Sequence, residues 1–504
     1  MPPSPTMRAP AATIASVAAA EKPADYFPAS RRSAAERVRW TLLAAFAAAL
    51  PLGIAVQQAA LALLLVWAVL APSWAAGRLV LPSRRALPRS PLDLPLAVLL
   101  AALLISTAFS PAPLKSLAAY DRLWIVGAYF ATYHLVRSRA EVERLVAITI
   151  AVAAAVAVYA VVQHFTGVDL SRAIVGRSAG LHAFWLGEGY RVKGFHPSGI
   201  TYAHNLLFPL TFATAWLTAA HAGGRGRVAL LCAWTAMVVA LVYSVTRGVW
   251  LAFAVVLLLT GVLRGGRPAI AAGTGLVVLL LLLVGVDPGI RARTRSAFDL
   301  PANIGRTQIW RANLDMARER PLLGWGYGNY KTFRQPFYDR YPDADTTAHA
   351  HNDFLQMQVD GGALSLTAFV ALFAVVLFHG WRGRRALAAA DPVVASDPIA
   401  ATPPIVASDP VGATPSVVAD GARVADDPTI ATEPARSVAL GGLLAVVGFL
   451  VGGLTQYNFG DAEVVIYLWF TVAILLRLPT LPSGDVSDGE AQRSSPLDPS
   501  PLSA

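Results

Sequence analysis

The stretch LVAITIAVAAAVAVYAVVQHF, residues 145–165, decides the fold class of this chain. It contains no Asp, Glu, Lys or Arg, and it is long enough to cross a bilayer as a helix, which takes about 17–25 apolar residues. Comparable apolar blocks lie near residues 40–56, 57–74, 92–109, 122–137, 201–220, 228–245, 247–264, 269–286, 358–379, 437–457 and 462–479. We therefore predict an all-α polytopic membrane protein with about 12 transmembrane helices.

The overall composition agrees with a membrane protein. Hydrophobic residues make up 55% of the 504 residues and charged residues only 14%, whereas soluble domains carry about 25% charged residues. The net charge of +10 does not point to nucleic acid, because the Arg residues concentrate in short loops between apolar blocks, as in cytoplasmic loops. Cys232 is the sole cysteine, so the chain has no intrachain disulfide and no thiolate metal cluster.

The distribution of basic residues predicts the orientation. With the N-terminus inside, twenty Arg residues close to the apolar blocks lie on the inside, and the short outside segments hold seven Lys or Arg residues. This excess follows the positive-inside rule and supports an even number of spans. We left residues 287–357 out of the count, because long loops cross the membrane largely regardless of charge.

The predicted organisation has seven parts. They are a disordered cytoplasmic tail at 1–38, helices 1–9 at 39–286 with a loop on the outside at 166–200, a large loop on the outside at 287–357 between helices 9 and 10, helix 10 at 358–380, a disordered Pro/Ala/Asp-rich cytoplasmic loop at 381–436, helices 11 and 12 at 437–480, and a disordered tail at 481–504. The loop at 381–436 repeats Val-Ala-Ser-Asp-Pro at 394–398 and 406–410, a composition that cannot bury a core. Pro51 and Gly53 leave open whether 39–74 forms one span or two.

His351 is the first candidate site residue, and Asn352 follows it at the end of the large loop. A histidine there titrates near neutral pH and can act as a general base. If residues 350–366 form a helix, His351 and Gly362 share one side of it. The alternative role for His351 is an interfacial residue hydrogen-bonded to a loop. A zinc site is the rival chemistry, but His349 and His351 are two apart and the i+4 position is Leu355.

Three arginines are candidates for binding an anion, because the guanidinium fork matches phosphate oxygens. Arg247 lies in Ser244-Val-Thr-Arg-Gly248 at an outside helix junction, Arg306 opens an amphipathic stretch with Trp310 one turn later, and Arg122 lies at an outer membrane edge. Snorkelling is the alternative for Arg247 and Arg122, and an ordinary surface position is the alternative for Arg306. His196 lies outside, before the sixth segment, where it can line the same cavity.

One further segment, Gly324-Trp-Gly-Tyr-Gly328, is rich in glycine but has no Gly-Lys-Ser/Thr ending. It therefore predicts a tight turn lined with aromatic rings rather than a nucleotide-binding loop.

Together these features resemble the O-antigen ligase and O-antigen polymerase superfamily. The family signature is His-Asn, nine residues, then Gly-x-x-Gly, Thr or Tyr; here it is His351-Asn352 followed by Gly362-Ala-Leu-Ser365, and Ser365 departs from the last position. The family's Ser-x-Thr/Ser-Arg-Gly matches residues 244–248. Its Arg-x-x-x-Trp and Gly-x-Gly match Arg306 to Trp310 and Gly324 to Gly326.

The resemblance implies an inverting glycosyltransferase in the bacterial inner membrane, with its active site facing the periplasm and with no metal or other cofactor. The implied donor is an undecaprenyl-pyrophosphate-linked glycan, and the implied acceptor is lipid A–core in a ligase. In this scheme His351 is the catalytic base, while Arg247, Arg306 and Arg122 bind the pyrophosphate. Asn352, Gly362, Trp310 and His196 support the site.

Other functions remain open at the level of sequence. A polymerase uses a second lipid-linked glycan as acceptor, and a protein O-oligosaccharyltransferase uses a protein hydroxyl. A secondary transporter is the main alternative that is not an enzyme, but the candidate polar residues cluster outside rather than at the membrane midplane. Nucleic acid is not an expected partner; membrane lipids are.

Overall fold

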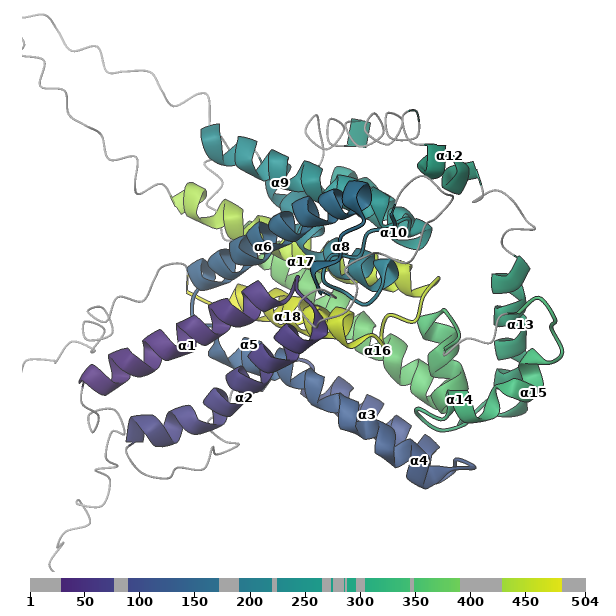
Figure 1. Cartoon of the computed structure of the whole chain (residues 1–504). Helices are drawn as coiled ribbons and strands as arrows, with labels where there is room; N and C mark the ends of the chain where they lie inside the picture. Colours follow the sequence, from purple (N-terminus) through teal and green to yellow (C-terminus); the bar gives the residue numbers. More distant parts are fainter. Residues whose placement is uncertain are drawn as a thin grey trace, which may run out of the picture.

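The computed structural model of the chain describes residues 29–76, 89–171, 190–219, 224–264, 273–274, 285, 288–295, 304–344, 349–389 and 428–482. Within these ranges, all regular elements are helices (Figure 1). The prediction of an all-α fold is confirmed for this part of the chain.

The N-terminal half contains α1 (Ala29–Ala49), α2 (Ile54–Ala76), α3 (Asp93–Ala108), α4 (Pro113–Ala118), η2 (Ala119–Val126), α5 (Gly127–Leu135), α6 (Arg139–Thr166), α8 (Gly199–Leu217) and α9 (Gly224–Tyr243). The C-terminal half contains α10 (Arg247–Arg264), α12 (Pro288–Arg295), α13 (Ile304–Glu319), α14 (Tyr330–Phe333), α15 (Gln335–Tyr338), α16 (Asp353–Ala389), α17 (Pro428–Gly453), α18 (Ala462–Arg477) and η4 (Leu478–Thr480).

Seven described helices are long and apolar enough to cross a membrane. Every predicted segment except 269–286 coincides with a described helix, and most of 269–286 lies outside the described residues. The prediction of twelve spans therefore stays a prediction. The turn at 50–53 separates α1 from α2, so residues 39–74 form two helices rather than one. Pro51 and Gly53 account for the break, since neither favours a helix interior.

Several predicted boundaries are corrected by the structure. Residues 29–38 are helical, and Arg39 ties α1 to the α5–α6 turn through an ion pair with Glu141 and a bond from Nη1 to the Leu135 oxygen at 2.7 Å. Helix α16 begins at Asp353 and continues to Ala389, and α17 begins at Pro428. The two helices are joined near these ends, because Arg436 Nη2 donates to the Ala388 oxygen at 2.7 Å. The rest of the loop predicted as disordered, 390–427, lies outside the described residues.

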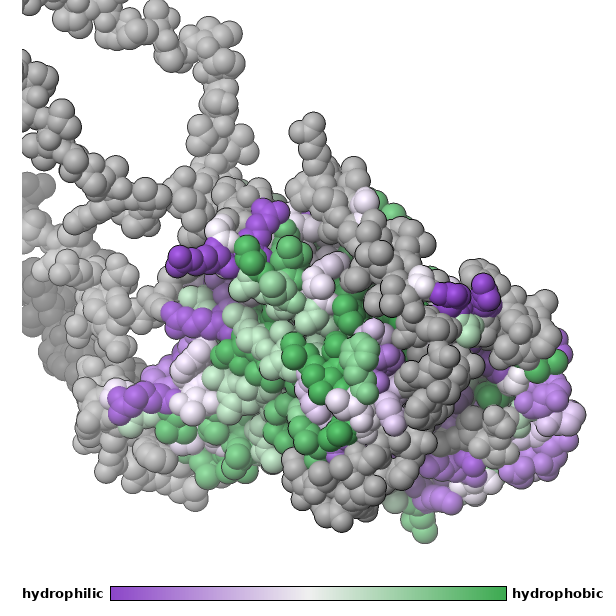
Figure 2. Space-filling model, turned by 45° about the horizontal axis from the view of Figure 1, so that its top comes forward, coloured by the Kyte–Doolittle hydropathy of each residue, from purple (hydrophilic) through white to green (hydrophobic). Residues whose placement is uncertain are grey.

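The centre of the bundle is formed by α17 and α18. Their membrane-spanning windows are 78% and 83% buried, against 22% for α2, so α2 is peripheral. Peripheral helices leave apolar side chains such as Leu63 and Leu258 exposed. Figure 2 shows hydrophobic residues gathered over the middle of the bundle and hydrophilic ones towards its ends. Such an exposed apolar belt is what lipid contact requires.

Helices α13 to α15, here called the cap, lie at one end of the bundle (Figure 1). Their cluster of buried residues, with Met316 and Phe337 among them, is separate from the main core. The amphipathic stretch that Arg306 opens forms α13.

The glycine-rich segment after α13 attaches the cap to the bundle. Gly324, Gly326 and Gly328 all have positive φ, as the predicted turn requires. The backbone oxygens at 323, 325 and 327 accept hydrogen bonds from three serines at 2.6–2.8 Å. They are Ser106 of α3, Ser110 of the connection 109–112, and Ser116 of α4. On its other side the segment pairs with α16, since Trp325 N donates to the Val359 oxygen at 2.9 Å.

Helix α16 is interrupted at Gly362, whose φ of 63° and ψ of −167° are not helical. A Cβ at this position would lie 2.2 Å from the Leu322 carbonyl carbon, so only glycine fits. Gly362 thus lets the segment after α13 lie directly against the backbone of α16. The predicted continuous helix over 350–366, with His351 and Gly362 on one side, is wrong, because the interruption and the start at Asp353 both break it.

Candidate functional site

His351 lies in the turn before α16 and is half-buried. Its φ is +53°, a left-handed conformation that is uncommon outside glycine. Its Nδ1 lies 2.7 Å from Oε1 of Gln456, in the loop between α17 and α18. An amide oxygen only accepts, so Nδ1 carries the proton in the neutral ring and Nε2 keeps its lone pair. His351 is thus prepared to take a proton at Nε2.

Asn352 fixes the position of this turn. Its Oδ1 accepts from Leu355 N at 2.9 Å, which makes it the N-cap of α16. Its Nδ2 donates to the Leu454 oxygen at 2.9 Å, at the start of the loop that carries Gln456. Asn352 therefore fixes the turn that carries His351 against the loop that carries Gln456.

Arg247 is the first residue of α10 and follows a strained turn. Val245, two residues earlier, has φ of +56°, and it and His351 are the two non-glycine residues with positive φ among those described. Such strain costs about 1–3 kcal/mol for a residue, and it tends to occur at functional sites. Arg191 holds this turn, donating from Nε to the Ser244 oxygen at 2.7 Å.

Arg306, in the first turn of α13, interacts electrostatically with both of the other candidates, Arg247 and His351. The pKa of its guanidinium is lowered by burial and further by the charge of Arg247. Arg306 in turn lowers the pKa of His351. Its side chain is nevertheless exposed to solvent, so it can reach a ligand from outside. Two guanidinium groups that repel each other beside an imidazole form a site that favours an anion.

The pKa of His351 is lowered from its ordinary value, mainly by burial, with Arg306 adding to the shift and the hydrogen bond to Gln456 opposing it. The ring of His349 lies 4.4 Å from that of His351. Burial, and next the charge of His351, lower the pKa of His349 to about 4. Both imidazoles are therefore neutral near pH 7, as a general base must be.

A metal site was the rival chemistry for the two histidines. Over the described ranges, no group of three or more His, Cys, Asp or Glu side chains is arranged to hold a metal ion.

Two of the predicted supporting residues have structural roles. Trp310 packs against the cap's own cluster and helps to hold α13. His196 was predicted to line the cavity, but it is 1% exposed and packs against Tyr202 at 5.6 Å between ring centroids. The prediction for His196 is therefore corrected: complete burial, which also lowers its pKa to about 4, keeps it away from any solvent-facing surface.

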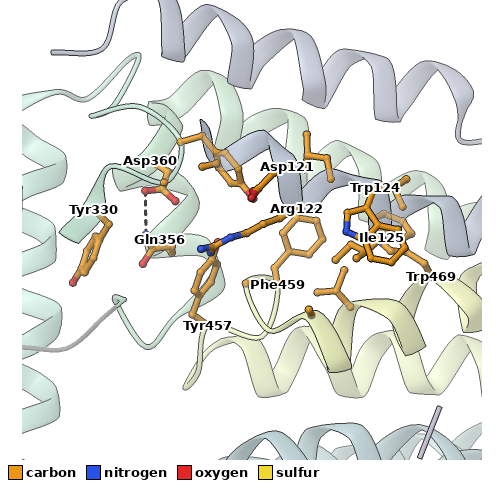
Figure 3. Close-up of a pocket in the computed structure, with 18 of the residues that line it drawn as sticks. Asp121, Arg122, Trp124, Ile125, Tyr330, Gln356, Asp360, Tyr457, Phe459 and Trp469 are labelled. Carbon is orange, nitrogen blue, oxygen red and sulfur yellow. Dashed lines mark hydrogen bonds between the residues drawn. The ribbon is translucent and has the colours of Figure 1, made fainter. Parts of the chain in front are cut away.

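Arg122 lines a separate pocket of about 360 Å³ that contains neither His351, Arg247 nor Arg306. Figure 3 shows its guanidinium pointing between Gln356 and Tyr457. The prediction that Arg122 joins the other two arginines is therefore not supported. We call this cavity the Arg122 pocket.

Comparison with known families adds one decisive observation. Residues 232–370 match the family model described as O-antigen ligase. The resemblance to the O-antigen ligase and polymerase superfamily is thereby confirmed. No curated protein matches the chain.

The O-antigen ligase match covers Arg247, Arg306 and His351, together with Asn352 and Gly362. It therefore includes the three residues that interact electrostatically, and it indicates ligase-type glycosyl transfer in general terms. Arg122 and His196 lie outside the matched range, as does Gln456.

Sequence reasoning missed Gln456 and its neighbour Tyr457, whose ring lies 5.7 Å from that of His349. One signal was available. The short segment Leu454-Thr-Gln-Tyr-Asn-Phe-Gly-Asp461 separates the last two apolar blocks, and the predicted orientation places it on the same side as His351. Polar residues in so short a connection are candidates for a site.

Proposed function

We propose that this protein is an inverting glycosyltransferase that moves an O-antigen-type glycan from undecaprenyl pyrophosphate to an acceptor hydroxyl, without a metal ion, at the periplasmic face of the bacterial inner membrane. The observation that carries the proposal is that the O-antigen ligase match contains His351, Arg306 and Arg247, with Arg306 in electrostatic contact with each of the other two.

In the proposed step, Nε2 of His351 takes the proton from the acceptor hydroxyl, and the acceptor oxygen bonds to the anomeric carbon of the donor sugar. The bond between that carbon and the pyrophosphate oxygen breaks, and its electron pair leaves with the pyrophosphate. The leaving group departs as an anion and needs no proton. Arg247 and Arg306 stabilise its growing charge. One direct displacement inverts the anomeric configuration.

We further propose lipid A–core as the acceptor, which makes the protein a ligase. In this reading the cap and the His351 turn face the periplasm, where a lipid pyrophosphate supplies activation without ATP. A polymerase that joins two lipid-linked repeat units uses the same chemistry, as does transfer to a protein hydroxyl.

Deletion of the gene, followed by analysis of the glycolipids, tests these functions. A ligase predicts lipid A–core without O-chain and long glycans that accumulate on undecaprenyl pyrophosphate. Core capped by one repeat unit indicates the polymerase instead. Normal polysaccharide with altered solute uptake contradicts both and favours a transporter.

A further inference from the structure

The Arg122 pocket has its own charged groups. Arg122 comes from η2, and Lys331 comes from α14 in the cap, so two distant segments each supply a cation. Both side chains are exposed to solvent. Within the described part of the chain, neither forms a hydrogen bond or an ion pair. Cations that converge on one pocket without internal partners are available for an external anion.

The remainder of the lining is suited to a sugar. Asp121 and Asp360 add carboxylates, which accept hydrogen bonds from sugar hydroxyls. Tyr327 and Tyr457 offer aromatic faces, and Arg122 acts on both phenols, since its charge lowers their pKa values against the larger raising effect of burial. Deeper in the pocket, Trp469 and other apolar side chains come from α18. The pocket thus has a charged region, formed by the Arg, Lys and Asp side chains, and an apolar region formed by α18. An amphipathic ligand requires both.

The pocket adjoins the catalytic turn. Gln356, one of its lining residues, accepts from Ala350 N at 2.7 Å, directly before His351. Tyr457, another lining residue, follows Gln456 and contacts His349. The charges of both Lys331 and Arg306 lower the pKa of His349, so His349 is within electrostatic reach of the Arg122 pocket and of Arg306.

We propose that the Arg122 pocket binds the acceptor, as a phosphate-bearing glycolipid whose anionic group is held by Arg122 and Lys331 and whose sugar hydroxyl is presented to His351. This inference rests on the proposed transfer reaction and assigns its two substrates to different cation pairs. Arg247 and Arg306 hold the donor pyrophosphate, and Arg122 and Lys331 hold the acceptor. The phosphate belongs either to lipid A or to a second lipid-linked glycan.

The test is equilibrium binding of two radiolabelled probes, lipid A and undecaprenyl pyrophosphate, to the purified full-length protein in detergent. The variants are Arg122→Gln, Lys331→Gln and Arg247→Gln. Arg311→Gln is the matched control, because Arg311 is an exposed cation of α13 outside the pocket. Elution volume and melting temperature establish that each variant is folded.

We expect Arg122→Gln and Lys331→Gln each to raise the Kd for lipid A about tenfold, the loss of one charged hydrogen bond, and to leave the Kd for undecaprenyl pyrophosphate within about twofold. Arg247→Gln should do the reverse. If lipid A does not bind, the stoichiometry of undecaprenyl pyrophosphate decides. Two equivalents bound to the wild type and one bound to Arg122→Gln support a lipid-linked acceptor in the same pocket.

Three outcomes overturn the inference. In the first, both pocket variants bind lipid A as the wild type does. In the second, Arg122→Gln loses as much affinity for undecaprenyl pyrophosphate as Arg247→Gln does, and in the third, the wild type binds one equivalent of undecaprenyl pyrophosphate and no lipid A. Failure of the proposed function looks different, because undecaprenyl pyrophosphate then binds Arg247→Gln as well as it binds the wild type.

Discussion

Nδ1 of His351 lies 2.7 Å from Oε1 of Gln456, although the two residues are 105 positions apart in the chain. The contact selects the ring tautomer with the lone pair on Nε2, and it orients the imidazole, as second partners of functional histidines commonly do. Gln456 is therefore a positioning residue in the proposed reaction.

Gln456→Leu should lower kcat about fivefold, since the loss of a hydrogen bond of about 1 kcal/mol releases the ring. It should also move the acid limb of the kcat/KM profile to lower pH, because the lost bond is one that raises the pKa of His351. Gln456→Glu keeps the acceptor and should retain activity with the limb at higher pH. Identical profiles for both variants and the wild type would remove the positioning role.

His351→Ala should abolish transfer while the protein still inserts into the membrane. His351→Asn separates chemistry from backbone geometry, because Asn tolerates positive φ but offers no base. We expect both variants to lack activity in a transfer assay with lipid-linked glycan. Activity in the Asn variant alone would show that residue 351 serves the turn and not the reaction.

Arg306→Gln should shift the acid limb of the transfer rate to higher pH. The charge of Arg306 lowers the pKa of His351, so its removal lets the imidazole protonate at a higher pH and lose its basic form. Rates measured from pH 5 to 8 at saturating donor report this shift. A limb that stays in place, or moves down, would contradict the electrostatic contact between the two side chains.

Arg247→Lys should reduce kcat by about 10²–10³-fold, the usual cost of losing one preorganised donor at a developing anion. A lysine keeps the charge but lacks the two-pronged donor geometry. Arg311→Lys, on the exposed face of α13, is the control and should behave as wild type. Near-normal turnover in Arg247→Lys would refute pyrophosphate binding by a guanidinium fork.

Gly362→Ala should destabilise the protein by at least about 1–3 kcal/mol, because φ of 63° with ψ of −167° is a region that is essentially restricted to glycine. The added Cβ also meets the Leu322 backbone at 2.2 Å. Gly226→Ala in α9 is the matched control, since a Cβ there meets nothing within 4 Å. Melting temperatures of the purified variants measure the difference in stability. Equal melting temperatures for the two variants would show that the segment after α13 can move away from residue 362 at little cost.

Much of the helical framework was predictable, because the length of each apolar block in the sequence gives the approximate length of its helix. The interaction between His351, Arg247 and Arg306 was predicted from three short motifs. The backbone at these motifs was not predictable: the positive φ at Val245 and at His351 arises from tertiary contacts, and neither residue type signals it strongly.

The wrong predictions have a common cause. The sequence indicates on which side of the membrane a residue lies, but it does not indicate which residues on that side lie next to one another. His196 and Arg122 were both placed at the outer side, yet one is enclosed in the core and the other lines its own pocket. Gln456 carried no motif at all, and its importance depends on a partner in a different helix-to-helix connection.

The connection between α17 and α18 has a consequence for biosynthesis. During translation, the imidazole, both guanidiniums and the cap are all made before Gln456, which follows His351 by 105 residues. A nascent protein therefore acquires its oriented base only when α17 and α18 have entered the membrane. In the proposed reaction, chains that have not yet inserted α17 and α18 lack the oriented base and do not transfer the glycan.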